Sequence, residues 1–318
     1  MLAYAGKKLP FVDKIINHII TEEQPRWFKF QKKQLDVLDI RGSTGVIQQV
    51  ISDRALSPDL VKKGVLFFNE PRTVNNFYAF NSEKSPFKGN KKLRQAISMA
   101  FDRNQFNALF YNNTGLLPQS VVPSTLIGHK SGYTNPYSAY NLEKAKQYLA
   151  AAGYPNGEGL PPITLDVFTE GRQRADLFSK CMSKIGVKIN VQVNIFSELV
   201  KKMQDRKTMM HGIAWSADYP DASTFLELLH HNEVGIMPIN DATYNALYKE
   251  AAVLQNSPAR TAMYEQLNTM AAGLAPAVYI MEESFLILHH NWVKNYVNSD
   301  FHFGQEQYWD IDLEKKGK

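Results

Sequence analysis

The sequence predicts an α/β fold in which strands and helices alternate along the second half of the chain. The clearest evidence lies between residues 163 and 217, where short apolar strands alternate with amphipathic helices. In one of these strands, Val187 to Val193, every second residue is apolar and those between are polar. A period of two is typical of a strand with one buried face. Alternation of strands and helices at this spacing favours parallel strands covered by helices.

The first part of the chain predicts a mixture of short strands and helices. Repeated isoleucines predict a strand from Phe11 to Ile20, and a helix is expected from Glu22 to Lys33. Another helix is expected to begin at Ser57-Pro58-Asp59, because serine caps helices and proline is tolerated in their first turn. Three further short strands, one of them rich in aromatic residues that favour strands, are predicted at 34–40, 65–68 and 76–80.

Later helices have clear start and stop signals. A short polar residue, which can accept a hydrogen bond from the first helical turn, precedes four amphipathic stretches: Asn90, Asn141, Asp241 and Ser257. Gly153 follows the second of these stretches, where a left-handed closing residue is favoured. Residues 111 to 140 are rich in Asn, Thr, Gly, Pro and Ser and predict a long loop. The chain is expected to be extended again from Ala277 to Leu288.

Composition excludes several classes of protein. The 318 residues are 44% hydrophobic and 21% charged, which is enough to bury a core and argues against disorder. The net charge of +5 is spread along the chain without a nucleic-acid-binding motif, so nucleic acid is not an expected partner. Cys181 is the single cysteine, so no internal disulfide can form, and its apolar helical surroundings predict a buried thiol.

Targeting signals are absent from the sequence as well. No run of about 18 apolar residues predicts a membrane-spanning helix. The first residues lack the pattern of a signal peptide, because their apolar part is too short and the basic residues follow it. The chain is therefore expected either to be cytosolic or to be an incomplete precursor.

No motif indicates catalysis, a metal or a cofactor. The chain lacks Gly-x-Ser-x-Gly, a phosphate-binding loop and His-Glu-x-x-His. The histidine pairs at 230–231 and 289–290 suggest zinc, but adjacent residues point to different sides of an element and acidic or cysteine partners at ligand spacing are missing. Asp218 and Asp221 lie three residues apart in a turn and have no set geometry for a glycosidase pair. We therefore expect no metal, no cofactor and no enzymatic activity.

Four segments carry a resemblance to a known family: 77–106, 140–165, 215–226 and, more weakly, 275–296. The first contains Pro86-Phe87, Arg94-Gln95-Ala96 and Ala100-Phe101-Asp102-Arg103, and the third reads WSADYPDASTFL. In content and order these segments resemble the family 5 extracellular solute-binding proteins. That family includes the oligopeptide- and dipeptide-binding components of bacterial ABC importers.

The resemblance implies a two-lobed α/β fold of the periplasmic-binding-protein type II kind. Two crossover strands would link the lobes, near Tyr78–Asn81 and near Tyr279–Met281. Residues 82–278 would form a nearly complete second lobe, and residues 1–81 and 279–318 a partial first lobe. Family members are typically much longer, so the chain resembles their carboxyl-terminal part only. The resemblance also implies a periplasmic or lipid-anchored location outside the inner membrane.

The turn that follows the predicted strand ending at Trp215 is the main candidate for a ligand site. A carboxylate beside Trp and Tyr at the carboxyl end of a strand is well placed to hold a cationic group. The resemblance implies that Asp218 receives the α-ammonium group of a peptide, and an ammonium removed from water needs a fixed counter-charge. From the residues alone, Asp218 could instead shape the turn before Pro220. Asp221 is interpreted as a helix cap.

Further candidate ligand-binding residues surround Asp218 or lie near the predicted hinge. The backbone of Ser216 and Ala217 could pair with a peptide that adds itself as a strand. The other candidates are side chains, for several of which a purely structural role is the alternative: Trp215, Tyr219, Asn81 and Tyr279.

The expected function is capture of a peptide between two lobes and its delivery to an ABC permease of the inner membrane. A second hypothesis keeps the fold but changes the solute to a nickel chelate, haem, an opine or an oligosaccharide. Asp218 favours a ligand with a positive amine, which argues against sugars more than against opines. A third hypothesis is an enzyme, such as a hydrolase that uses the Asp218 turn.

Overall fold

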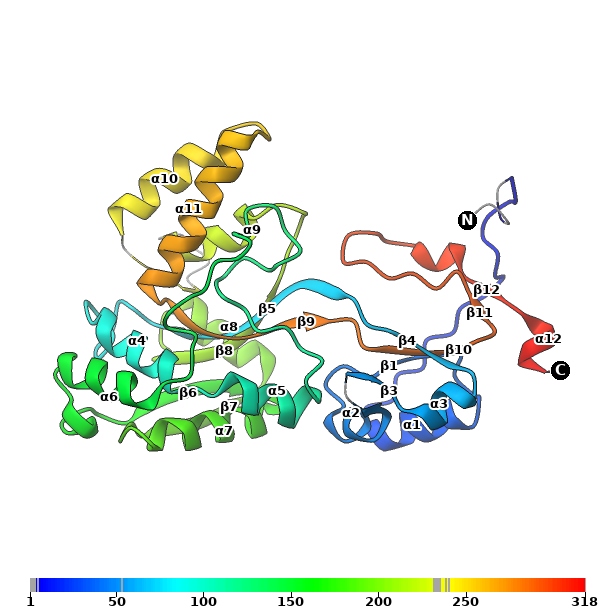
Figure 1. Ribbon diagram of the computed structural model, residues 1–318, viewed down its shortest axis with the longest axis horizontal. Coiled ribbons are helices and arrows are strands. Elements are labelled where there is room, and N and C mark those ends of the chain that lie inside the picture. The colour runs from blue at the N-terminus through cyan, green and yellow to red at the C-terminus, as the bar shows by residue number, and fades with distance from the viewer. Residues whose placement is uncertain are drawn as a thin grey trace. The chain divides into compact units, whose positions relative to one another are not determined.

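The structure is a computed structural model that describes residues 4, 6–52, 54–230, 236–237, 239 and 241–317. The chain forms two compact units (Figure 1). Unit 1 consists of Met1–Arg72, Ala108–Thr114 and Ser284–Lys318, and unit 2 of Thr73–Asn107 and Gly115–Glu283. The main changes of unit, at 72/73 and 283/284, differ by nine and five residues from the lobe boundaries predicted at 81/82 and 278/279.

A five-stranded sheet runs through unit 2 in the order β7-β6-β8-β5-β9. Its strands, in that order, are Ile189–Asn194, Ile163–Phe168, Met210–Ser216, Pro71–Phe80 and Ala277–Ser284. Strand β6 is parallel to both β7 and β8, as the alternation of strands and helices predicts. Strand β5 is antiparallel to β8. The parallel strands β6, β7 and β8 therefore bring their carboxyl ends to one edge of the sheet.

The helices of unit 2 begin where the capping signals predict. The side chains of Asn90, Asn141, Asp241 and Ser257 each accept a hydrogen bond from a backbone N–H in the first turn. The longer helices are α4 (Lys91–Ala100), α5 (Arg103–Tyr111), α6 (Leu142–Ala151), α7 (Arg172–Ser183), α8 (Phe196–Gln204), α10 (Ala242–Ala252) and α11 (Pro258–Leu274). The short ones are α9 (Ser223–Leu226) and the 3₁₀ turns η2 (Pro155–Gly157), η3 (Thr169–Gly171) and η4 (Glu227–Leu229).

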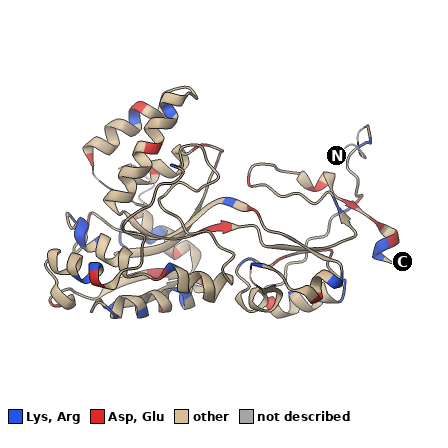
Figure 2. Ribbon diagram, in the orientation of Figure 1, with Lys and Arg blue, Asp and Glu red and all other residues tan. Residues whose placement is uncertain are grey.

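Helix α5 was not predicted from the sequence, and its last four residues belong to unit 1. Figure 2 shows acidic and basic residues interspersed along the helices of both units.

Two buried arginines tie the core of unit 2 together. The Arg103 guanidinium donates hydrogen bonds to the backbone oxygens of Tyr279 (2.6 Å), Ser138 (2.9 Å) and Ser98 (3.1 Å). Arg94 likewise donates to the backbone oxygens of Phe87, Leu274 and Ala275. Burial lowers the pKa of Arg103 to about 9 and that of Arg94 to about 10. Both residues belong to the motif at 94–103, so this motif has a structural function.

His211 makes the stability of unit 2 sensitive to pH. The ring is buried beside Thr208, and burial lowers its pKa to about 4 even though Asp166 nearby favours the charged form. Because the unfolded chain binds the proton more readily, stability falls as the pH drops from about 6.5 toward 4. We expect His211 to lower the free energy of unfolding by about 2 kcal/mol between pH 7 and pH 5.

Urea unfolding of the wild type and of His211→Gln at both pH values tests this, since glutamine stays neutral. The wild type should lose more stability than the variant on acidification. Equal losses in the two proteins would show that His211 has no part in the pH dependence.

Unit 1 contains a three-stranded antiparallel sheet in the order β1-β10-β4. These strands are Val37–Asp39, Ile287–His290 and Val65–Phe68, and the helices are α1 (Glu23–Gln31), α2 (Thr44–Val50) and α3 (Pro58–Lys62). Two short strand pairs, a 3₁₀ turn and a last helix complete the unit: β2 (Ile51–Ser52) with β3 (Ala55–Leu56), β11 (Val293–Lys294) with β12 (Asp310–Ile311), η5 (Gln305–Tyr308) and α12 (Leu313–Lys316).

The prediction of a strand from Phe11 to Ile20 is wrong. This segment has no regular secondary structure, and Ile16 and Ile19 are 62% and 96% exposed. The isoleucines occur as two adjacent pairs, at 15–16 and 19–20, rather than at every second position, so they do not define one buried face. No strand in the described part of the chain pairs with the segment.

The histidines of strand β10 are packed in the core of unit 1. The ring of His290 stacks between Phe30 (4.2 Å) and Trp292 (4.0 Å), and His289 stacks on Tyr296. Burial lowers the pKa of both histidines. His230 packs against Tyr248, whereas His231 lies outside the described residues.

No group of three or more His, Cys, Asp or Glu side chains in the described part of the chain could hold a metal ion. Among the described helices, none combines the length and the apolar character that crossing a membrane requires. Cys181 is buried, as predicted.

Candidate ligand site at the turn between β8 and α9

Strand β8 leads directly into the candidate site and has one open edge there. Its pairing with β6 ends at His211, whereas its pairing with β5 continues to Ser216. The N–H of Ala217 donates to the backbone oxygen of Thr73 on the β5 side. Since backbone groups alternate along a strand, the N–H and C=O of Ser216 face the opposite edge. No strand among the described residues pairs with that edge beyond His211.

Asp221 is a neutralised carboxylate within the turn. It accepts a hydrogen bond from the N–H of Ser223 at the start of α9 (2.9 Å) and forms an ion pair with Arg260 of α11 (2.5 Å). The Arg260 guanidinium also lies over the ring of Tyr264 (4.5 Å). Partial burial would raise the pKa of Asp221, but the hydrogen bonds from Arg260 and Ser223 outweigh it and lower the pKa. These contacts agree with the helix-capping interpretation of Asp221.

Asp218 lies in the same turn but keeps its charge uncompensated. Its side chain is exposed, and it forms no ion pair within the described ranges. Its Oδ2 accepts a hydrogen bond from the hydroxyl of Thr224 (3.4 Å), and its backbone N–H donates to the same hydroxyl (3.3 Å). The turn therefore presents one free negative charge, held in place by a neutral residue.

Aromatic side chains flank Asp218. Trp215 is half-buried, and its indole N–H donates to the hydroxyl of Thr224 (3.4 Å). Tyr219 is 45% exposed, and its hydroxyl lies 3.2 Å from the hydroxyl of Ser223. The structure thus places Trp215, Asp218 and Tyr219 together at the end of β8.

Glu227 is a second acidic residue of this region that was not predicted from the sequence. It is half-buried in the turn η4, and burial together with the charge of Asp218 raises its pKa. The charge of Asp218 thus reaches Glu227, although the two residues lie in different elements. The signal in the sequence was a single acidic residue within the apolar stretch 225–229.

An aromatic pair with one exposed member lies at the same edge of the sheet and was also missed. Phe168 at the end of β6 stacks on Phe196, which follows β7, with ring centroids 5.3 Å apart. Phe196 and the preceding Ile195 are 70% and 65% exposed. Apolar residues directly after the alternating strand 187–193 were the available signal. This edge is the one where open α/β sheets usually bind their ligands.

Asn81 and Tyr279 make structural contacts in unit 2. The amide of buried Asn81 donates to the backbone oxygens of Thr208 (2.8 Å) and Arg206 (3.1 Å). Tyr279 is 1% exposed, and its hydroxyl has no hydrogen-bond partner within the described part of the chain. Burial raises the pKa of Tyr279. A ligand-binding role for these two residues stays a prediction.

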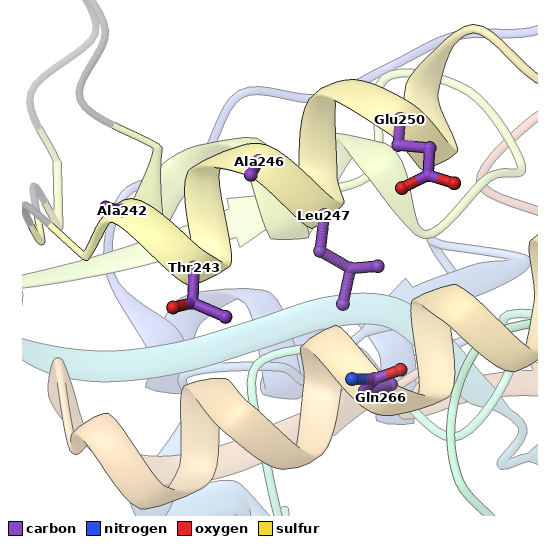
Figure 3. Close-up of a pocket in the computed structure, with 6 residues that line it drawn as sticks. All are labelled: Ala242, Thr243, Ala246, Leu247, Glu250 and Gln266. Carbon is purple, nitrogen blue, oxygen red and sulfur yellow. The ribbon is translucent and has the colours of Figure 1, made fainter.

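A groove elsewhere on unit 2 is a weaker candidate. It lies between α10 and α11, has a volume of about 470 Å³ and is lined by Ala242, Thr243, Ala246, Leu247, Glu250 and Gln266 (Figure 3). None of these residues was predicted to bind a ligand, and Glu250 is the only charged group among them. With one charged group and no aromatic side chain in its lining, the groove has fewer features of a specific ligand site than the turn at Asp218.

Comparison with known proteins places these features in a family context. The family model described as bacterial extracellular solute-binding proteins, family 5 Middle, matches residues 3–235. The chain is 27% identical to heme-binding protein A of Haemophilus influenzae over 314 residues, 96% of this chain and 54% of that protein. It is 21% identical to the dipeptide-binding protein of Escherichia coli over 320 residues, 98% of this chain and 57% of that protein.

Solved structures share the fold. The periplasmic binding protein DppA of Helicobacter pylori, in complex with a peptide, matches with a TM-score of 0.74 at 18% identity and covers 92% of this chain and 56% of its own. HbpA2 of Haemophilus parasuis matches with a TM-score of 0.71 at 20% identity and covers 93% and 57%. The predicted α/β fold of the periplasmic-binding-protein kind is confirmed. The chain spans slightly more than half the length of these relatives.

Proposed function

Because this chain belongs to family 5 of the bacterial extracellular solute-binding proteins, we propose that it binds peptides as part of an ABC importer, with Asp218 as counter-charge for the ligand amine. The proposal includes a location outside the inner membrane and delivery to a permease. Ligand capture by closing lobes involves no covalent chemistry, so we propose no enzymatic activity. The names of the E. coli and H. pylori relatives support a peptide as the solute.

The observation that carries the proposal is the contrast between Asp218 and Asp221. Both carboxylates lie in one turn, but Arg260 neutralises Asp221 while Asp218 has no ion pair in the described structure. A cation that moves from water to this turn could pair with the Asp218 carboxylate directly. It would not first have to displace a protein cation from that carboxylate. A peptide amino terminus has the charge and the hydrogen-bond donors that this arrangement favours.

The surroundings of Asp218 support a ligand with a peptide backbone and apolar side chains. Ser216 presents its backbone N–H and C=O at the open edge of β8, where an extended peptide could pair without regard to its sequence. At the carboxyl ends of β6 and β7, exposed Phe196 and half-buried Phe168 offer an apolar surface for a ligand side chain.

Haem is the second candidate solute. The 27% identity to a heme-binding protein over 96% of this chain favours it, and a stacked aromatic pair suits a flat porphyrin. However, haem carries two propionate carboxylates, which the charge of Asp218 would repel. The charge of the turn therefore supports an amine-bearing ligand over haem.

A thermal-shift panel tests the proposed function. We expect alanyl-phenylalanyl-alanine to raise the melting temperature, since a ligand at about 100 times its Kd stabilises a protein by roughly 2.7 kcal/mol. Haem, a maltooligosaccharide and a nickel chelate should have little effect. Mass spectrometry should recover the peptide unchanged. Stabilisation by haem alone would contradict the peptide proposal, and cleavage of the peptide in proportion to protein would indicate an enzyme.

A further inference from the structure

Thr224 connects the two most prominent side chains of the candidate site. Its side chain is completely buried at the start of α9, and its hydroxyl makes three hydrogen bonds. It accepts from the indole N–H of Trp215 (3.4 Å) and from the backbone N–H of Asp218 (3.3 Å). It donates to Oδ2 of Asp218 (3.4 Å). A hydroxyl has one donor and two acceptor positions, so this arrangement uses its full capacity.

We propose that Thr224 is the positioning residue of this site, which holds Asp218 and Trp215 ready for the ligand amine. The inference rests on the proposed function. Asp218 is exposed and lacks an ion pair in the described structure, so without Thr224 its carboxylate would sample several rotamers. A ligand would then have to fix the Asp218 side chain in one rotamer, and the lost conformational entropy would weaken binding.

The surroundings of Thr224 suit this role. Its hydroxyl donates to Oδ2 of Asp218, so it restrains the carboxylate that would bind the cation. Threonine is β-branched and stiff at χ1, and its buried methyl group fixes the direction of the hydroxyl. Threonine thereby fixes a carboxylate without neutralising it, whereas Arg260 neutralises Asp221 in the same turn.

The test compares trialanine with N-acetyl-trialanine by calorimetry. In Thr224→Val, which keeps the shape but lacks the hydroxyl, we expect about tenfold weaker binding of trialanine. Binding of N-acetyl-trialanine, which has no ammonium group, should change less than about twofold, because Asp218 has no cation to hold. Thr224→Ser keeps the hydroxyl and should remain within about threefold of the wild type for both ligands. The matched control is Thr269→Val, since the Thr269 hydroxyl donates to the backbone oxygen of Glu265 within its own helix.

The possible outcomes separate this inference from the proposed function. If the wild type binds both ligands equally or neither, the proposed function fails and the inference fails with it. If the wild type prefers trialanine but Thr224→Val weakens both ligands equally, or neither, only the positioning role is overturned. Thr224→Ala is the second variant in case valine disturbs folding. Failure of both variants to fold, with Thr224→Ser folded, would make the hydroxyl a folding determinant and overturn the positioning role.

Discussion

Arg103→Met is expected to destabilise unit 2 by about 3 to 5 kcal/mol. The reason is that methionine fills much of the volume but leaves the backbone oxygens of Ser98, Ser138 and Tyr279 buried without the donor they have in the wild type. Arg103→Lys should give an intermediate loss, because an ammonium lacks the planar fork of donors that reaches several acceptors at once. Urea unfolding followed by circular dichroism measures both variants.

The matched control for Arg103 is Arg172→Met. Arg172 lies on the surface of the same unit, with 55% of its side chain exposed, and forms an ion pair with Asp176 one helical turn away. Pairs of this kind contribute about 0.3 to 0.5 kcal/mol. If Arg103→Met lowers the free energy of unfolding by less than about 1 kcal/mol, as the control does, a structural role for this arginine is contradicted.

Asp218→Asn is expected to weaken binding of a free-amine tripeptide by roughly 1.5 to 3 kcal/mol, the scale of a hydrogen bond to a charged group. This corresponds to a Kd about 10 to 150 times higher. Asparagine preserves the size of the side chain and can still accept a hydrogen bond from Thr224, so the loss reports the charge. Calorimetric titration with trialanine measures it. The control is Asp176→Asn, an exposed aspartate of α7 whose neutralisation should leave the Kd unchanged.

Elements defined by local chemistry were predictable from the sequence. Asn90, Asn141, Asp241 and Ser257 cap helices because a short polar side chain and the first helical turn are neighbours in the chain. The alternation at 187–193 predicted β7, because its period of two reflects one buried face. The segment from Phe11 to Ile20 was apolar but lacked this period, and apolar content without a partner strand does not make a strand.

Features that depend on distant residues could not be predicted in the same way. The sequence predicted different roles for Asp218 and Asp221, but not the ion pair that separates them, because Arg260 lies 39 residues beyond Asp221 in the chain. The importance of Glu227 depends on the electrostatic influence of Asp218, which lies in a different element. Phe196 is conspicuous only because it is exposed, and exposure follows from the packing of α8 on the sheet.

The hydrogen bonds of Arg94 and Arg103, the two arginines of the motif at 94–103, could not be predicted from the sequence either. Both arginines belong to a segment that resembles the family, but their hydrogen-bond acceptors are backbone oxygens up to 181 residues away in the chain. Backbone acceptors leave no trace in the sequence, so only the structure distinguishes these arginines from ligand-binding ones.

A thermodynamic cycle that combines Asp218→Asn with N-acetylation of the ligand tests the central claim most directly. Calorimetry would give the affinities of wild type and variant for trialanine and N-acetyl-trialanine. If Asp218 holds the ligand ammonium, either change alone should weaken binding, and the second should add little to the first. The coupling free energy is then expected to be about 1.5 to 3 kcal/mol. A coupling near zero, with each change acting independently of the other, would show that Asp218 does not contact the amine.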